Sequence, residues 1–115
     1  MSIKRGDVFY VNLDPTKGAE QAGTRPVLVI QNDVGNDVAP TVIVAPLTTK
    51  IFTKHYPMNV HVQRGVAGLK EHSTILLSQI RTIDKTRLDR NIGRLPSSYL
   101  KQVNQAIRIS LGLSL

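Results

Sequence analysis

The sequence predicts a single small domain, mostly β, that forms an antiparallel barrel and ends in one α-helix. Its 115 residues and 12.7 kDa are enough for one hydrophobic core and one domain, 1–115. Five or six short segments of strand-forming residues alternate with polar loops that contain glycine and proline. Near the end, apolar residues instead recur at three- and four-residue spacing, as in an amphipathic helix. Short strands followed by one helix favour a small barrel.

Three strands are predicted in the first half of the chain. They span 7–13, 26–32 and 41–49, and polar loops span 16–24 and 33–40. The first strand ends at Asp14-Pro15, because proline cannot donate to a sheet. The second strand, PVLVIQN, is continuously apolar at its centre, so we expect both its faces to be buried. Pro46 limits pairing at the end of the third strand.

The second half predicts shorter strands and then the helix. After a loop at 50–57, strands are expected at 58–63, 74–83 and 91–95, with a turn at 64–68 and one helical turn at 84–90. Pro96-Ser97-Ser98 is a helix-start signal, and Gly112 is a plausible stop. The apolar stripe between them consists of Leu100, Val103, Ile107 and Leu111.

The chain is strongly basic, with 15 Lys and Arg against 8 Asp and Glu, a net charge of +7 and a pI near 10.2. Residues 1–24 are neutral overall, whereas 81–108 hold seven basic and two acidic residues. Such a stretch attracts phosphate backbones, an acidic protein or an anionic membrane, and otherwise is a solvated surface. No apolar run is long enough to span a membrane, and no export signal is seen at the start, so we expect the cytoplasm.

Several kinds of chemistry are not expected from this sequence. There is no cysteine, which excludes disulfides, thiol nucleophiles and thiolate metal sites. The three histidines, His55, His61 and His72, are scattered without metal-site spacing. No nucleotide-binding glycine motif occurs. We therefore expect neither a metal nor a cofactor.

Two polar segments stand out at strand ends. In the first, DPTKGAEQAGTRP, Arg25 joins a mobile loop to a buried strand, where its guanidinium could bind a phosphate. The alternative is that Arg25 anchors the loop to a backbone carbonyl or to Glu20. In the second, APLTTK, the hydroxyls of Thr48 and Thr49 could contact phosphate oxygens or instead satisfy backbone groups in a turn.

Three blocks of sequence resemble the MazF/PemK family of bacterial toxin endoribonucleases. They are RGDVFYVNLDPTKGAEQAGTRPVLVIQN (5–32), APLTT (45–49) and LLSQIRTIDKTRL (76–88). Their order and spacing cover nearly the whole chain, and the chromosomal MazF branch looks closer than the plasmid PemK branch. The resemblance implies an SH3-like barrel with a C-terminal helix that works as a homodimer. This agrees with the strand pattern.

The resemblance also implies an activity, which is sequence-specific cleavage of single-stranded RNA, usually mRNA, without a metal. The ribose 2′-OH attacks its own phosphate and leaves a 2′,3′-cyclic phosphate and a 5′-OH. The resemblance places the family's catalytic arginine at Arg25, through the GTRP motif, and its catalytic hydroxyl at Thr48, through the PLTT motif. Glu20 is the nearest carboxylate and could orient Arg25 or take a proton. The implied substrate-binding residues are Lys17, Glu20, Gln21, Thr49, Gln79 and Arg81.

The chain departs from its relatives at two positions. Plasmid members have a histidine in place of Ala19 and an acid in place of Ser78, so no acid–base role is expected at Ser78. Few aromatic residues are available to stack on RNA bases. Phe52 and Tyr56 follow Thr49 and are either base-stacking residues or anchors of their loop.

The implied partners follow from the type II toxin–antitoxin assignment. We expect a cognate acidic, MazE-like antitoxin in a bacterial cytoplasm, with DNA reached only through the antitoxin complex and no membrane contact. Two other functions compete: a CcdB-like toxin that binds DNA gyrase without catalysis, and a plain SH3-like binding module. Arg25 and Thr48 within their motifs favour the nuclease.

Overall fold

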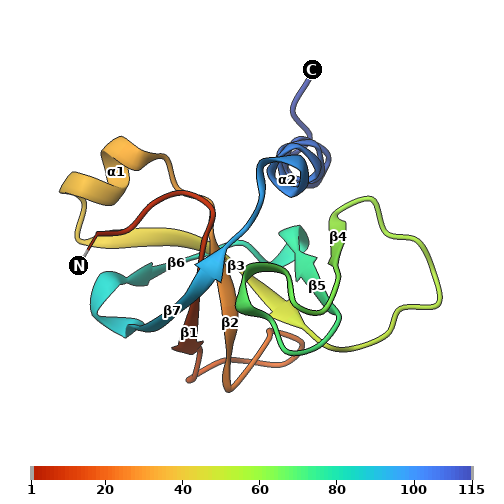
Figure 1. The fold of residues 1–115 in the computed structure, drawn as a ribbon, viewed down its shortest axis with the longest axis horizontal. Helices are drawn as coiled ribbons and strands as arrows, with labels where there is room; N and C mark the ends of the chain where they lie inside the picture. Colours follow the sequence, from red (N-terminus) through yellow and green to blue (C-terminus); the bar gives the residue numbers. More distant parts are fainter. Residues whose placement is uncertain (1, 115) are drawn as a thin grey trace.

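A computed structural model describes residues 2–114 of the chain as a strongly curved antiparallel sheet with two α-helices (Figure 1). The strands are β1 (Asp7–Asn12), β2 (Thr24–Val29), β3 (Thr41–Thr48), β4 (Asn59–Val62), β5 (Ser73–Leu76), β6 (Arg81–Asp84) and β7 (Leu88–Arg94). The helices are α1 (Asp33–Val38) and α2 (Ser97–Leu111), and short 3₁₀ turns are η1 (Val66–Gly68), η2 (Leu77–Gln79) and η3 (Lys85–Arg87).

The strands are ordered β4-β5-β3-β2-β1-β7, and β6 pairs with β3. The central strand β3 has two successive partners on one edge: Thr41–Val44 pairs with β6, and Leu47–Thr48 pairs with β5. Its other edge pairs with β2. This sharing bends the sheet around its own core.

Within residues 2–114 the end strands β4 and β7 do not pair, and η1 packs against β7 instead. Two glycines allow this close approach. A Cβ on Gly68, whose φ is +75°, would lie 1.8 Å from the Ile92 carbonyl oxygen, and one on Gly93 would lie 2.4 Å from Ala67. The predicted small barrel with a C-terminal helix is therefore confirmed in a barrel-like form whose hydrogen-bonded sheet is not closed.

The hydrophobic core lies on both faces of the sheet. One cluster joins Leu28 and Leu47 to Val103 and Ala106 of α2, and the other encloses Val27, which is fully buried between β1, β3 and β6. Residues 27–29 show no exposed surface, which confirms that the second predicted strand is buried on both faces.

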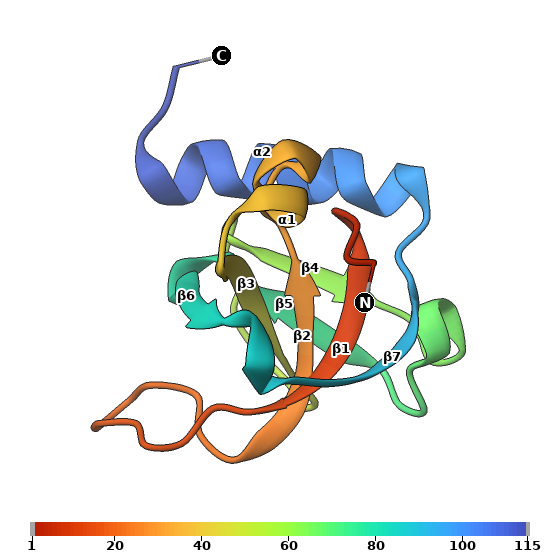
Figure 2. The same cartoon turned by 90° about the vertical axis from the view of Figure 1, so that its left-hand side faces the viewer.

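The C-terminal helix matches its predicted limits. It begins after Pro96 and ends at Gly112, which has a φ of +69° and donates its N–H to the carbonyls of Arg108 and Ile109. Figure 2 shows α2 at one end of the strands and the β1–β2 loop at the opposite end. No helix among residues 2–114 is both long and apolar enough to cross a membrane.

Three local predictions are wrong. The predicted loop 33–40 contains α1, a six-residue helix whose start is capped by the Asn32 side chain, which accepts from Gly35 N–H. Its two apolar side chains, Val34 and Val38, lie four residues apart but are 74% and 78% exposed, and two residues in a six-residue helix make too short a pattern. Helical periodicity therefore could not reveal it.

The other two errors concern 74–83 and the segment that follows. The predicted strand is interrupted by η2, because β5 and β6 pair with different parts of β3 and the chain must bend between them. The predicted turn at 84–90 shortens to η3, where Asp84 accepts from Thr86 N–H, and β7 starts early, at Leu88.

Candidate active site

The two predicted catalytic residues lie at the ends of neighbouring strands. Arg25 is the second residue of β2 and Thr48 is the last residue of β3, and these strands pair antiparallel, with Val27 opposite Pro46. Both side chains line one cavity of about 210 Å³, the central hollow. Its other lining residues are Thr24, Pro26, Leu47, Thr49 and Ser73.

The Arg25 guanidinium is held in a fixed orientation. Nε donates to the Ala22 carbonyl at 2.9 Å, and Nη1 donates to the Leu47 carbonyl at 3.2 Å. The alternative from the sequence, an arginine that anchors the loop to a backbone carbonyl, is thus observed. These bonds use two of the five N–H groups of a guanidinium, so an anion in the hollow can still be bound.

The hydroxyl of Thr48 also has a backbone partner. Its side chain is almost buried, and Oγ1 accepts from Lys50 N–H at 3.2 Å. The turn interpretation of the sequence is therefore correct for Thr48. Because Oγ1 acts as an acceptor here, its own proton remains available to an oxygen in the hollow.

Glu20 lies in the β1–β2 loop and is bound locally. Its Oε1 accepts from Lys17 N–H at 2.6 Å. In the described part of the chain, Glu20 and Arg25 form no ion pair, and the recorded ion pair joins Arg94 and Asp7 at 3.2 Å. The expectation that Glu20 orients Arg25 is not met in this conformation.

A larger cavity of about 670 Å³, the loop hollow, lies between the β1–β2 loop and the η2–β6 segment. It gathers five of the six predicted substrate-binding residues: Lys17, Glu20, Gln21, Gln79 and Arg81. The sixth, Thr49, lines the central hollow. Ala19 and Ser78, where the chain departs from its relatives, also line the loop hollow.

Gln79 fastens the loop over this cavity. Its Oε1 accepts from Gln21 N–H at 2.7 Å, and its Nε2 donates to the Ala19 carbonyl at 3.4 Å. Arg81 donates to the Leu13 carbonyl at 3.1 Å at the base of the same loop. Both residues therefore hold the loop as well as line the space beneath it.

Part of the basic stretch 81–108 is structural. Arg87 donates to the carbonyls of Asn12 and Asp14, and Arg90 lies 5.2 Å from the centre of the Tyr10 ring. The hydroxyl and the backbone N–H of Thr86 hold the pKa of the Asp84 carboxyl below its ordinary range. Asp84 thus caps η3.

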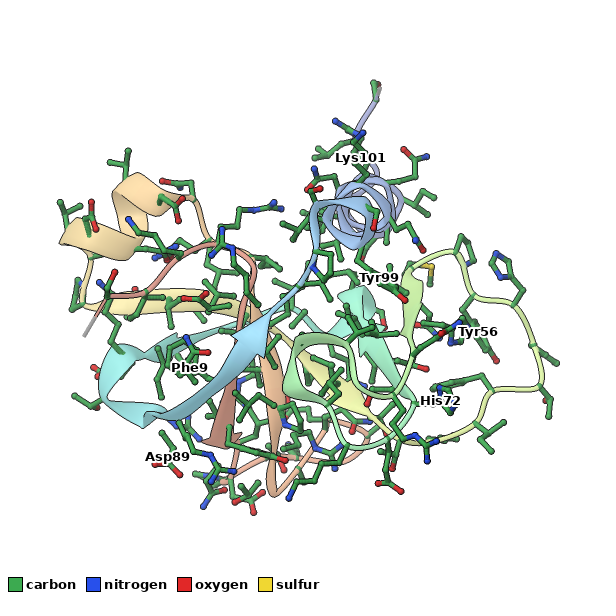
Figure 3. The ribbon with its side chains drawn as sticks, viewed as in Figure 1. Phe9, Tyr56, His72, Asp89, Tyr99 and Lys101 are labelled. Atoms are coloured by element: carbon green, nitrogen blue, oxygen red, sulfur yellow. The ribbon has the colours of Figure 1, made fainter. Side chains whose placement is uncertain are left out.

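The candidate stacking residues contact each other. Phe52 and Tyr56 form a T-shaped pair with ring centres 5.8 Å apart, and Lys50 Nζ lies 5.2 Å from the Phe52 ring centre. Figure 3 places Tyr56 on the side of the molecule where the β3–β4 loop projects. No group of three His, Cys, Asp or Glu residues suited to a metal ion occurs among residues 2–114.

Sequence reasoning missed two features of this region. Ser73 lines the central hollow although it is the first residue of β5, far along the chain. His61 and His72 line a third cavity beside it. The spacing of these residues in the sequence carries no sign of the contact, which arises only when β4 pairs with β5 next to β3.

Comparison with known proteins identifies the family of the chain. Residues 4–111 match the family model for the PemK-like, MazF-like toxin of type II toxin–antitoxin systems. The chain belongs to this family. Two curated relatives are each 48% identical: Endoribonuclease EndoA of Bacillus subtilis, over 98% of this chain and 97% of the relative, and Endoribonuclease MazF of Staphylococcus saprophyticus, over 96% and 92%.

Solved structures of relatives share the fold. The crystal structure of MazF from Deinococcus radiodurans is 25% identical, with a TM-score of 0.84 and coverage of 98% of this chain and 99% of that one. A MazE–MazF complex from the same organism has a TM-score of 0.76 at 26% identity and covers 99% of each chain. The two curated relatives confirm the prediction that this member of the family is an endoribonuclease, ahead of the gyrase-binding and binding-module alternatives.

Proposed function

We propose that the chain is the toxin of a type II toxin–antitoxin system and cleaves single-stranded RNA at a short sequence by metal-independent transesterification. The observation that carries this proposal is the meeting of Arg25 and Thr48 in one hollow, at the ends of adjacent strands. A guanidinium and a hydroxyl suit the two non-bridging oxygens of a phosphodiester.

The reaction has three requirements. The ribose 2′-OH must lose its proton, the extra negative charge on phosphorus must be stabilised, and the leaving 5′ oxygen must gain a proton. Arg25 stabilises the charge, because its orientation is already fixed by Ala22 and Leu47. Thr48 donates to a second phosphate oxygen. The phosphorus–oxygen bond to the 5′ oxygen breaks as the bond to the 2′ oxygen forms, and the departing 5′ oxygen takes a proton from water to become the 5′-OH.

Arg25 is a poor proton acceptor because a guanidinium keeps its proton at neutral pH. Glu20 is the carboxylate nearest to it in the motif, and it lies in a loop that also lines the substrate cavity. Reorientation of this loop on RNA binding would have to release Glu20 from Lys17 before the carboxylate could act as the base.

The RNA strand occupies the loop hollow beside the cut. Lys17 and Arg81 attract the phosphate backbone, and the amides of Gln21 and Gln79 supply groups that can hydrogen-bond to base edges. Thr49 contacts the strand from the central hollow.

The decisive experiment is cleavage of a long single-stranded RNA by the purified chain, followed by mapping of both new ends. The expected products carry a 5′-OH and a 2′,3′-cyclic phosphate, and the rate is unchanged in excess EDTA. Products with a 5′-phosphate, or a reaction that stops in EDTA and resumes with Mg²⁺, would overturn the proposed chemistry.

The partner we propose is an acidic antitoxin with a segment that covers Arg25 and Thr48. The net charge of +7 favours such a segment, and a related toxin has been solved with MazE. Because opposite charges are screened over about 8–10 Å at physiological salt, the association rate should fall as salt rises.

A competition experiment tests this shared site. The antitoxin peptide and a non-cleavable RNA analogue are titrated together against the toxin, and each is expected to displace the other. Simultaneous binding without mutual weakening would contradict it.

A further inference from the structure

A third cavity adjoins the central hollow and shares no lining residue with the loop hollow. Its volume is about 190 Å³, and it shares Thr49 and Ser73 with the central hollow. Lys50, Phe52, His61 and His72 supply its other functional side chains, so we call it the histidine hollow. Phe52 is one of the two aromatic residues predicted to stack on RNA bases, whereas neither His61 nor His72 was a predicted site residue.

The three hollows follow β3 and the start of the next loop in chain order. Pro46 lines the loop hollow, Leu47 and Thr48 line the central hollow, and the chain from Thr49 to Phe52 lines the histidine hollow. An RNA strand with its reacting phosphate on Arg25 and Thr48 therefore has one neighbouring nucleotide on each side. The nucleotide on the far side from the β1–β2 loop reaches the histidine hollow.

The two imidazole rings of this hollow are held by specific partners. His61 lies opposite Thr74 in the β4–β5 pair, and its Nδ1 is 3.1 Å from Thr74 Oγ1. His72 Nδ1 accepts from Arg64 N–H at 3.2 Å. A neutral His72 ring thus carries its proton on Nε2, which has no hydrogen-bond partner within residues 2–114. That N–H can donate to a carbonyl oxygen or ring nitrogen of a base.

The other side chains suit the rest of a nucleotide. The half-buried Phe52 ring offers a surface on which any base can stack. Lys50 Nζ lies 5.2 Å from the centre of that ring, where an ammonium can also meet the flanking phosphate. Figure 3 shows His72 on the same side of the molecule as the projecting β3–β4 loop that carries Phe52.

We infer that the histidine hollow receives the base of the nucleotide next to the cut, opposite the loop hollow, and that His61 and His72 select this base. The inference rests on the proposed function and adds a specificity site to it. A peptide side chain of the antitoxin is the competing occupant, and a hollow that binds no nucleotide in the titration below would favour it.

The first test uses the histidines as their own probes, because the chain has only three. The ring signals of His55, His61 and His72 are followed by NMR while each of the four ribonucleoside 3′-monophosphates and 5′-monophosphates is added. We expect His61 and His72 signals to shift saturably with at least one nucleotide, while His55, which lies outside the hollow, does not respond. Whether the 3′ or the 5′ series binds identifies the side of the cut.

Equal movement of all three histidines, or no movement with any of the eight nucleotides at millimolar concentration, would overturn the inference. This titration needs no cleavage. It therefore shows whether the histidine hollow binds a nucleotide even if the wild-type chain cuts no RNA. Loss of cleavage by itself would reject the proposed function and leave this inference standing.

The second test compares cleavage of an RNA pool randomised around the cut. His61→Ala and His72→Ala should reduce the base preference at one position beside the cut about tenfold and leave the other positions unchanged. Phe52→Ala should raise KM about 5- to 100-fold for all sequences, since it removes a stacking surface. His55→Ala is the matched control, with a wild-type profile. Active His61→Ala and His72→Ala variants with unaltered profiles would show that the base is read elsewhere.

Discussion

The guanidinium of Arg25 is positioned before any substrate arrives. Two backbone carbonyls, from the loop that precedes β2 and from the end of β3, fix its plane at the rim of the central hollow. A donor that needs no reorganisation as charge develops contributes more to catalysis than a mobile one. The two bonds tie Arg25 to the β1–β2 loop, which carries Glu20, and to the end of β3, which carries Thr48. A change in the position of the loop would therefore move the guanidinium.

Arg25→Ala should abolish most cleavage with little change in folding, because the half-buried side chain lies outside both core clusters. Loss of one charge-stabilising donor commonly costs about 100- to 1000-fold in rate. Thr48→Ala should lose the same or less. The measurements are single-turnover cleavage and thermal unfolding, with the exposed Arg64→Ala as control. An Arg25→Ala protein that cleaves within a few-fold of wild type would show that the assignment is wrong.

Among the elements, the bend at η2 connects the site to the core. Leu77 is fully buried in the core cluster that includes α2. Its N–H donates to the Met58 carbonyl, and its carbonyl accepts from Ser110 Oγ at 2.7 Å. Two residues later, Gln79 binds the β1–β2 loop. The packing of α2 therefore fixes the position from which the loop is held.

Leu77→Ala should lower the free energy of unfolding by about 2–5 kcal/mol, since it leaves a cavity in the core. Chemical denaturation at constant pH measures this. The control is Val38→Ala on α1, whose side chain is 78% exposed and whose effect should stay within about 0.5 kcal/mol. Equal effects of the two variants would contradict the packing described here.

The short helix α1 should contribute to stability in a pH-dependent way. The Asp33 carboxylate accepts a hydrogen bond from the backbone N–H of Arg5 and another from the Asn36 side chain. These bonds, chiefly the one from Arg5, hold the pKa of Asp33 below its ordinary range. A lowered pKa in the folded state stabilises the protein above the unfolded pKa, and this stability is lost as the pH falls below about 4.

The thermal unfolding temperature of the wild type should therefore fall as the pH drops below this value. The unfolding temperature of Asp33→Asn should fall less steeply. Asp37→Asn is the control, because the Asp37 side chain has no hydrogen bond in the described part of α1. Identical pH profiles of wild type and Asp33→Asn would rule out this contribution.

At the scale of the whole molecule, the end of α2 exposes apolar surface. Ile109, Leu111 and Leu113 are 42%, 59% and 57% exposed, on the end of the molecule away from the β1–β2 loop. This surface is the one that we expect to be buried in the homodimer implied by the resemblance.

Sedimentation should give a particle of about twice 12.7 kDa at micromolar concentration. Leu111→Glu should shift it toward the monomer, because a buried charge opposes association. Leu113→Ser is a milder companion that keeps the charge unchanged. A fully active wild-type monomer at that concentration would reject the homodimer.

The sequence alone was enough for several features that depend on neighbours along the chain, although it missed the short helix α1. Gly112 and Pro96 mark the limits of α2, and the run Val27–Val29 reveals a strand buried on both faces. The family motifs predict Arg25 and Thr48 as site residues, and both line the central hollow. Each of these signals arises within a few residues, through backbone geometry, local periodicity or a continuous motif.

The remaining features were decided by the tertiary structure, because they depend on contacts between residues far apart in the chain. The strand predicted at 74–83 breaks at η2 because β3 takes two partners on one edge. Arg25 is oriented by Leu47, 22 residues away, and Gln79 holds a loop 58 residues before it. His61 and His72 share a hollow only because β4 pairs with β5 beside β3. Strand pairing brings these groups together at the cost of ordering the chain between them, and no local pattern records which strands will pair.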